Sequence, residues 1–301
     1  MIEKIGNLKL NLNYYYGQDL YSDGDIEDEL LEIVKKNKNY DNIIKSDNRW
    51  PILYHLSQDR ENIIDWYPFD NEGDILEIGA GCGAITGALA KLTKSVTCVE
   101  LSKRRSLINA YRNNECDNVE IIVGDFNKIE FEKKFDYITL IGVLEYAPSF
   151  SKSSMPFHEL LSYVRKLLKP NGKLFIAIEN KFGLKYWAGA REDHTGEFFD
   201  SLEGYKKNNN VRTFSKKELT EILIEVGFKL NNFYYPIPDY KLPKQIFSDA
   251  RLPQIGEIRN ILHNFDQDRV QLFKEETVID TLIENDKFDF FANSFLVISE
   301  H

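Results

Sequence analysis

The stretch DILEIGAGCGAITGALA, residues 74–90, constrains the fold of this chain more than any other. An apolar run leads into three glycines at alternate positions, and small and apolar residues with helical spacing follow. Glycines between a strand and a helix remove Cβ atoms, so a ligand can lie against the backbone at the helix start. Gly79, Gly81 and Ala84 also fit the loose dinucleotide pattern G-x-G-x-x-G/A, so the glycines alone do not identify the ligand.

From residue 73 onward, short β-branched runs alternate with amphipathic runs. The predicted strands are 74–78, 95–100, 118–123, 135–141, 172–179, 228–237 and 288–299, and the predicted helices are 84–92, 103–113, 156–168 and 216–226. Strands that alternate with helices need crossover connections, which produce a parallel sheet. We therefore expect an α/β protein with a Rossmann-like, seven-stranded, mostly parallel sheet and helices on both faces.

The expected main domain is residues 73–301, and two long segments interrupt it, at about 181–213 and 237–287. Insertions of this length in a compact domain are usually lids or substrate sites, and we expect lid-like insertions here. Residues 1–72 are expected to form an N-terminal helical and aromatic cap.

The N-terminal cap has one predicted helix at 25–36, acidic at its start and basic at its end as the helix dipole prefers. A second helix is expected after Ser57. The tyrosines of NYYYGQDLY, residues 13–21, either close over the ligand or pack as part of a strand.

Acidic residues stand at the ends of three neighbouring predicted strands, which share one crevice in a parallel sheet. Glu77 precedes the glycines inside an apolar strand, where a carboxylate needs hydrogen-bond donors or a cationic ligand group. Glu100 can accept both hydrogens of a ribose cis-diol, and Asp125 can accept from an adenine amino group while Phe126 stacks on the ring. Alternatively, Glu100 and Asp125 only cap the segments that follow them.

At residues 73–180 the sequence resembles the class I S-adenosylmethionine-dependent methyltransferases. EIGAGCG matches the family's E-x-G-x-G-x-G motif, GDF its adenine position and FDYITLIGVLEYAP its fourth-strand motif. The resemblance implies S-adenosyl-L-methionine as the cofactor, with the methionine part near Glu77, the ribose at Glu100 and the adenine at Asp125. The expected cofactor-binding residues are Glu77, Gly79, Ala80, Gly81, Gly83, Glu100, Leu101, Asp125, Phe126, Ile141, Gly142 and Arg60.

Of these residues, Arg60 would reach the cofactor carboxylate, and the alternative is a surface arginine on a helix. A narrower likeness covers most of the chain, through phrases such as AIENKFGLKYWAGAREDHTG and FYYPIPDYKLP. It is to bacterial methyltransferases associated with glycosyltransferases and surface-polysaccharide synthesis. This likeness implies a setting and no particular substrate, because fold does not determine substrate.

Methyl transfer needs the donor and acceptor held in line, and a hydroxyl acceptor also benefits from a general base. His194 in REDHTG is the expected base, with Asp193 or Glu192 to orient it, or else His194 and Asp193 tie down a lid. We expect a small-molecule, sugar or peptide acceptor, with O-methylation slightly favoured over N-methylation. LEYAP stands where nucleobase- and glutamine-methylating relatives carry Asn or Asp before two prolines and an aromatic residue.

Composition limits the classes of binding partner that we expect. The net charge of -10 argues against nucleic acid, and no apolar run has the length of a signal peptide or membrane span, so we expect a cytoplasmic protein. The three cysteines lack C-x-x-C spacing, so no disulfide framework or zinc site, and no other metal site, is expected. Oligomeric state is not predicted. The competing functions are a non-catalytic scaffold with this fold in a biosynthetic complex and a nicotinamide-dependent oxidoreductase.

Overall fold

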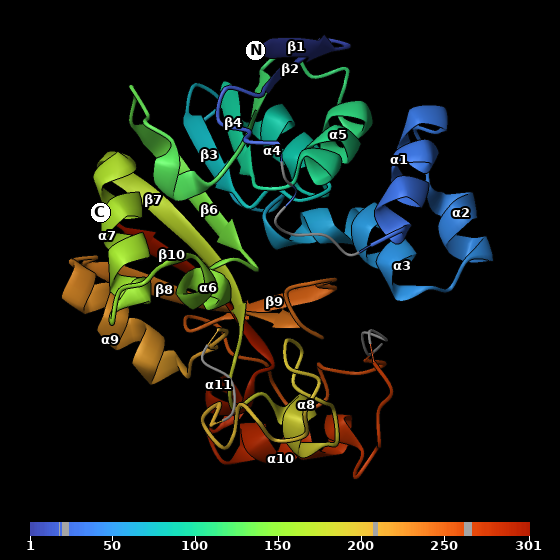
Figure 1. The fold of residues 1–301 in the computed structure, drawn as a ribbon. Helices are drawn as coiled ribbons and strands as arrows, with labels where there is room; N and C mark the ends of the chain where they lie inside the picture. Colours follow the sequence, from blue (N-terminus) through green and yellow to red (C-terminus); the bar gives the residue numbers. More distant parts are fainter. Residues whose placement is uncertain (18, 20–23, 207–209, 262–266) are drawn as a thin grey trace. The chain divides into compact units, whose positions relative to one another are not determined.

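The computed structural model describes residues 1–17, 19, 24–206, 210–261 and 267–301 (Figure 1). It divides into two compact units. The N-terminal unit comprises Met1–Leu140 and Leu167–Gly172, and the C-terminal unit comprises Ile141–Lys166 and Lys173–His301. This division falls inside the expected main domain, and the boundary at residue 72 stays a prediction.

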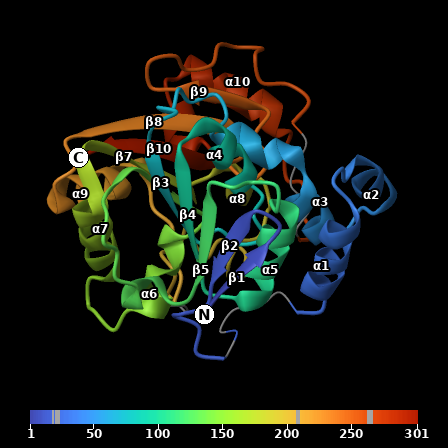
Figure 2. The ribbon, with the colours of Figure 1, turned by 90° about the horizontal axis from the view of Figure 1, so that it is seen from above.

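The N-terminal unit contains six strands in the order β1-β2-β5-β4-β3-β6. Their bounds are β1 Ile2–Ile5, β2 Leu8–Asn11, β3 Asp74–Ile78, β4 Ser95–Glu100, β5 Val119–Val123 and β6 Phe135–Ile141. β1 and β2 form an antiparallel hairpin, and the pairs β2–β5, β5–β4, β4–β3 and β3–β6 are parallel. The hairpin extends the sheet beyond β5 (Figure 2).

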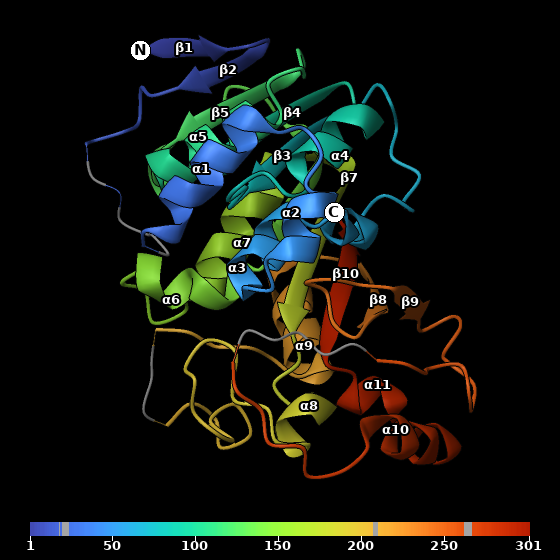
Figure 3. The same cartoon turned by 90° about the vertical axis from the view of Figure 1, so that its right-hand side faces the viewer.

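Helices of the N-terminal cap pack against the helix that follows β4. The helices of this unit are α1 Ile26–Lys36, α2 Asp41–Ser46, α3 Trp50–Leu56, η1 Gln58–Ile63, α4 Thr86–Leu92, α5 Lys103–Arg112 and η2 Phe126–Lys128. α1 lies alongside α5 (Figure 3), where Leu30 and Val34 share a buried cluster with Ile108. Beside this cluster, Arg105 Nε is 2.7 Å from Glu27 Oε1, a buried carboxylate. The expected helical cap is therefore an integral part of this unit.

The C-terminal unit is built on antiparallel strands. They are β7 Leu168–Glu179, which enters this unit at Lys173, with β10 Ser294–Glu300, β8 Leu230–Ile237 and β9 Gln245–Ser248, in the order β7-β10-β8-β9. β10 is antiparallel to both β7 and β8. In the aromatic core, the Tyr235 ring contacts Phe288 and the buried Phe295, with ring centroids 5.7 Å and 6.2 Å apart.

The strand count was wrong, because the described residues form ten strands and not seven. All seven predicted strands are present, and β1, β2 and β9 are additional. β1 and β2 have four residues each, and their short alternating pattern was assigned to the helical cap. β9 lies inside the second expected insertion.

The remaining helices belong mainly to the C-terminal unit. They are η3 Leu144–Tyr146, α6 Ala147–Phe150, α7 Pro156–Leu167, α8 Leu184–Trp187, α9 Lys216–Val226, α10 Glu275–Glu284 and α11 Phe288–Phe291. α9 has the capping box of Ser215 and Glu218, and Gly227 ends it at φ +101°. The start of the predicted strand 288–299 is instead the helix α11.

Two further sequence predictions concern a membrane span and the aromatic stretch near the N-terminus. Among the helices of the described ranges, none is both long and apolar enough to cross a bilayer. In the aromatic stretch 13–21, Gln18, Leu20 and Tyr21 lie outside the described residues.

Candidate active site

The glycine turn between β3 and α4 is held against the end of β4. The Val99 carbonyl accepts hydrogen bonds from the N–H groups of Gly79, at 2.9 Å, and Ala80, at 3.2 Å. Gly79, Gly81 and Gly83 have φ values of +72°, +53° and +75°, in the left-handed region that favours glycine. The backbone conformation of the turn therefore explains why glycine occupies all three alternate positions.

Gly81 and Gly83 have different surroundings. A Cβ added to Gly83 would lie 2.3 Å from Asn109 Oδ1, so this glycine allows close packing against α5. A Cβ added to Gly81 would meet no atom of the described residues within 4 Å. The turn thus borders open space at Gly81, as a turn that receives a ligand against its backbone requires.

Glu100, at the end of β4, is buried, and backbone donors bind both of its carboxylate oxygens. Oε2 accepts from the Gly81 N–H at 2.8 Å, and Oε1 accepts from the Ser102 N–H at 2.9 Å. Burial raises the pKa of Glu100 above its usual value. Because each carboxylate oxygen has two lone pairs, these bonds fix the side chain and leave acceptor capacity for a ribose diol. Leu101, between these contacts, is half-buried.

Glu77 in β3 is also buried, and its donors are side chains. Oε2 accepts from the Thr86 hydroxyl at 2.6 Å and from the Cys98 thiol at 3.3 Å. Burial raises the pKa of Glu77 to about 7, while the positive charge of Arg60 acts in the opposite direction. A cationic group of a ligand would favour the ionised form of this carboxyl in the same way.

Arg60 was open to interpretation as a surface arginine, and this interpretation is wrong. Arg60 is 6% exposed in η1, and its guanidinium carbon lies 4.2 Å from the centroid of the Tyr54 ring. The sequence pattern around Ser57 predicted a helix but could not show that its arginine faces inward. Its charge therefore acts inside the N-terminal unit, near Glu77.

Asp125 and Phe126 lie where β5 ends and η2 begins. The Asp125 side chain accepts from the Asn127 N–H at 3.1 Å and lies 3.4 Å from Lys128 Nζ. The Phe126 ring centroid is 5.9 Å from that of Phe131. Asp125 thus caps the following turn, as the alternative interpretation expected, and its side chain stays 24% exposed.

Ile141 and Gly142, the remaining expected cofactor residues, belong to the C-terminal unit. Gly142 has φ +69°, and its N–H donates to the Ala177 carbonyl at 2.9 Å. A Cβ added to Gly142 would lie 2.9 Å from the Tyr240 hydroxyl. Three residues later, Glu145 lies in a buried charged group.

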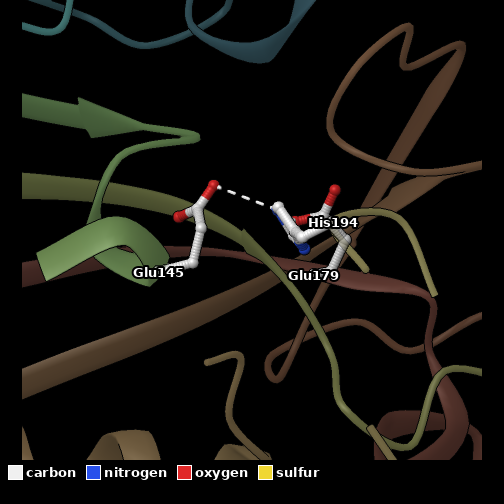
Figure 4. Close-up of side chains that lie close together, drawn as sticks. All are labelled: Glu145, Glu179 and His194. Carbon is white, nitrogen blue, oxygen red and sulfur yellow. Dashed lines mark ion pairs between the residues drawn. The ribbon is translucent and has the colours of Figure 1, made fainter. Parts of the chain in front are cut away.

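We call this group the His194 cluster; its members are Glu145, Glu179, Glu192, Asp193, His194, Lys185 and Lys241. His194 Nδ1 is 3.0 Å from Glu192 Oε1. Nε2 of the same ring lies 3.6 Å from Glu145 Oε1 and 3.7 Å from Glu179 Oε2 (Figure 4). His194 is therefore surrounded by three carboxylates that come from η3, β7 and its own loop.

These carboxylates determine the charge of His194. Burial opposes protonation of the imidazole, but the charge of Glu179 and the contacts with Glu145 and Glu192 outweigh it. The pKa of His194 is therefore held well above its usual range, and the ring is protonated at neutral pH. A general base has to be neutral before it accepts a proton.

Asp193 points to a different set of partners. Its Oδ2 lies 2.8 Å from Lys185 Nζ and accepts from the Tyr186 hydroxyl at 2.6 Å, and Lys241 contacts the other oxygen. Despite burial, the charges of Lys185 and Lys241 hold the pKa of Asp193 well below its usual range. Glu192, the second orienting residue considered from the sequence, is the one that contacts the His194 ring.

Sequence reasoning did not find four residues of the cluster, namely Glu145, Glu179, Lys185 and Lys241. Glu179 ends the apolar run of β7, a signal of the same kind that identified Glu77 and Glu100. Glu145, Lys185 and Lys241 lie in segments without a regular pattern. Only the fold brings these four positions near His194.

Comparison with known proteins agrees with this geometry. Residues 76–174 match the model of the methyltransferase domain family. The ubiquinone biosynthesis O-methyltransferase of Coxiella burnetii is 30% identical over 117 residues, which are 36% of this chain and 44% of that protein. The tRNA (guanine-N(7)-)-methyltransferase of Corynebacterium glutamicum is 29% identical over 145 residues, 44% and 56% of the two chains. The chain thus spans about half the length of the curated relatives it matches.

Among solved structures, the chain resembles phosphoethanolamine N-methyltransferase 1 of Haemonchus contortus, in complex with phosphoethanolamine and S-adenosylhomocysteine. The TM-score is 0.50 at 13% identity, and the match covers 92% of this chain and 48% of that one. At this identity the likeness shows the fold, which is the Rossmann-like α/β fold of the methyltransferases.

Residues 76–174 thus match a methyltransferase domain, and the chain has the Rossmann-like fold of S-adenosylmethionine-dependent methyltransferases. The predicted enzyme class and the predicted cofactor, S-adenosyl-L-methionine, agree with these matches. The named relatives include a ubiquinone-pathway enzyme and a tRNA enzyme, so similarity assigns no acceptor to this chain and does not establish the predicted exclusion of nucleic acid.

Proposed function

We propose that this protein transfers a methyl group from S-adenosyl-L-methionine to a small-molecule, sugar or peptide acceptor, with a hydroxyl favoured over an amine. The observation that carries the proposal is the glycine turn: Gly81 borders open space, and its N–H holds the buried Glu100 carboxylate in place. Together with the match over residues 76–174, this arrangement supports a cofactor site at the end of β3 and β4.

Each part of the cofactor has a proposed partner in the N-terminal unit. The methionine part would lie along Gly79 and Gly81 near Glu77, with Arg60 as the charge for its carboxylate. The ribose hydroxyls would donate to Glu100. Asp125 and Phe126 would receive the adenine, and the partial exposure of the Asp125 side chain supports this assignment. When bound, the cofactor supplies the electrophilic methyl group.

The proposed catalytic residues are His194 and Asp193. Asp193 holds Lys185 and Lys241 within the cluster, and His194 would take the proton of the acceptor hydroxyl. Because three glutamates favour the imidazolium, His194 becomes a base only as pH rises above the ordinary titration range of histidine. Methyl transfer that depends on His194 should therefore increase with pH.

The acceptor class follows from charge and from resemblance. A net charge of -10 disfavours a polyanion such as RNA. The likeness of several phrases to methyltransferases of surface-polysaccharide synthesis supports a sugar or sugar nucleotide in that setting.

A methyl-transfer assay with radiolabelled S-adenosylmethionine tests the proposal directly. The panel would contain sugars, sugar nucleotides, short peptides, small phenols and bulk tRNA. Labelled product from a sugar or another small molecule supports the proposal, and product from tRNA alone contradicts the acceptor class. Cofactor binding without turnover of any acceptor would instead favour the non-catalytic scaffold.

A further inference from the structure

We propose that Glu145, Glu179 and His194 form a binding site for a divalent transition-metal cation. The inference rests on the geometry of the C-terminal unit and is independent of the proposed methyl transfer.

The donor atoms already lie near the spacing that one ion requires. Each of the three residues offers one ligand atom, and these atoms lie within 4.8 Å of one another. His194 Nε2 is 3.6 Å from Glu145 Oε1 and 3.7 Å from Glu179 Oε2. Two ligands bonded to one ion at ~2.1 Å stand about 3.0 to 3.4 Å apart, so small shifts of the side chains complete the site.

A second observation is independent of this spacing. Glu145 is 1% exposed and Glu179 is fully buried, and within the described ranges Oε2 of each has no hydrogen-bond donor. Such an atom loses its water without gaining a partner, which costs free energy. Figure 4 shows the Glu145 carboxylate directed toward His194. One oxygen of that carboxylate faces His194, and a cation between these side chains would also give the orphaned Glu179 Oε2 a partner.

The contacts behind His194 have the form expected of a metal ligand. Glu192 Oε2 accepts from the backbone N–H groups of His194 and Thr195, both at 2.7 Å, which fixes this carboxylate. Its Oε1 lies 3.0 Å from Nδ1 of the His194 ring. When a cation displaces the Nε2 proton of the imidazolium, Nδ1 can still donate to Glu192 while the freed lone pair of Nε2 binds the cation, as in carboxylate–histidine–metal arrangements.

The charges of the region are unequal. Lys185, Lys241 and the protonated His194 provide three positive charges against five buried carboxylates, which belong to Glu145, Glu179, Glu192, Asp193 and Asp239. Lys241 Nζ lies 2.9 Å from Glu179 Oε1, which leaves Oε2 on the side of His194. A divalent cation would offset the excess negative charge.

The donor set selects the kind of ion. One imidazole nitrogen and two carboxylates, without a thiolate, suit Mn²⁺, Fe²⁺ or Zn²⁺ better than an all-oxygen ion such as Ca²⁺. A bound cation would make His194 a ligand, so the base role proposed above would apply to the cation-free protein.

The test is titration of Mn²⁺ into the chelator-treated protein, with the concentration of free Mn²⁺ measured by electron paramagnetic resonance. We expect one site per chain. Glu145→Gln, Glu179→Gln and His194→Gln should each weaken binding at least roughly tenfold, because losing even a supporting residue outside the ligand set costs ~10- to 100-fold. The matched control is Glu197→Gln, an exposed glutamate in the same loop, which should bind as the wild type does.

A spectroscopic measurement on the wild type needs no variant to fold. Pulsed electron paramagnetic resonance of the Mn²⁺ complex should show coupling to one imidazole nitrogen. Absence of stoichiometric binding at millimolar Mn²⁺, binding without nitrogen coupling, or equal affinity in the folded cluster variants and Glu197→Gln would each overturn the proposal. None of these outcomes bears on S-adenosylhomocysteine binding. The metal site and the proposed function are therefore tested independently of each other.

Discussion

Oε2 of Glu100 accepts a hydrogen bond from the N–H of Gly81 over 2.8 Å, and this bond joins the end of β4 to the middle of the glycine turn. The carboxylate is buried and fixed before any ligand arrives. Because this acceptor is already held in place, less conformational entropy is lost when a ribose hydroxyl binds to it. The relationship between these two residues therefore underlies the account of the cofactor site.

Gly81→Ala should weaken binding of S-adenosylhomocysteine, because the new Cβ occupies the open space at the turn. Alanine at φ +53° should also lower the free energy of unfolding by ~1 to 2 kcal/mol. Gly204→Ala is the matched control, since Gly204 has φ +83° and equally open surroundings in the C-terminal unit. Calorimetry should find at least roughly tenfold weaker binding only in Gly81→Ala. Equal affinities in the two variants would count against a ligand at Gly81.

Glu77→Gln should change how stability depends on pH in the cofactor-free protein. The pKa of Glu77 is raised from 4.5 to about 7, so the native state binds more protons than the unfolded state between these values. Stability then falls as pH rises through this window, by roughly 2 to 3 kcal/mol from this residue. Glutamine lacks the titration, so urea unfolding should show this fall in the wild type and not in Glu77→Gln.

The matched control for this change is Glu72→Gln, because the Glu72 side chain is 76% exposed. Its stability should follow the wild type at every pH. Parallel curves for the wild type and Glu77→Gln between pH 4.5 and 7 would contradict the assigned pKa.

His194 should remain an imidazolium at pH 7.5 in chelator-treated protein, as followed by nitrogen NMR of its ring. Its raised pKa depends on Glu145 from η3, Glu179 from β7 and Glu192 from its own loop. Glu145→Gln and Glu179→Gln should each lower this pKa, and Glu197→Gln should leave it unchanged. A neutral ring at pH 7.5 in the wild type would show that the glutamates do not control its charge.

Because the pKa of His194 is raised in the native state, protonation of its ring stabilises the fold. The contribution is fully present below the unfolded pKa and is lost as pH rises through the native one. His194→Gln should therefore be less stable than the wild type at neutral pH, with a difference that shrinks in alkaline solution. Thermal unfolding at several pH values measures this, and a difference that grows with pH would be inconsistent with it.

Asp193→Ala should destabilise the protein by about 3 to 5 kcal/mol, because it leaves Lys185 buried without this partner. Asp268→Ala removes the acid of the Arg191–Asp268 pair, whose Asp268 side chain is 84% exposed, and should leave the unfolding midpoint nearly unchanged. Chemical denaturation of both variants provides the comparison. Similar midpoints for the two would mean that the buried pair contributes no more than the exposed one.

Periodic patterns predicted the fold where the chain is regular. Each predicted strand from 74–78 to 172–179 corresponds to a strand of the structure, and Ser215, Glu218 and Gly227 mark the ends of α9 as expected. The patterns were insufficient where they are short or uniform. The run that begins at Phe288 is rich in apolar residues without a clear period, and such a run fits a helix such as α11 as well as a strand.

The sequence predicted the cofactor-binding residues better than it predicted the His194 cluster, and the reason is physical. Glu77, Glu100 and the glycines lie at or just after the ends of β3 and β4, and a parallel sheet brings the ends of its strands together. The His194 cluster instead combines Glu145, Glu179 and Lys241 with a loop residue, and no periodicity relates their positions. Sequence reasoning found His194 from its titration chemistry, but only the fold shows that three glutamates surround it.

The central claim is best tested by calorimetric titration of S-adenosylhomocysteine into the wild type and into Glu100→Ala. Hydrogen bonds to a charged group contribute ~1.5 to 3 kcal/mol each, so loss of the ribose contacts should weaken binding at least roughly tenfold. Circular dichroism establishes that the variant is folded. Tight binding to the wild type that weakens in Glu100→Ala is the predicted result, and no binding to the wild type, or equal binding to both, would contradict the cofactor site described here.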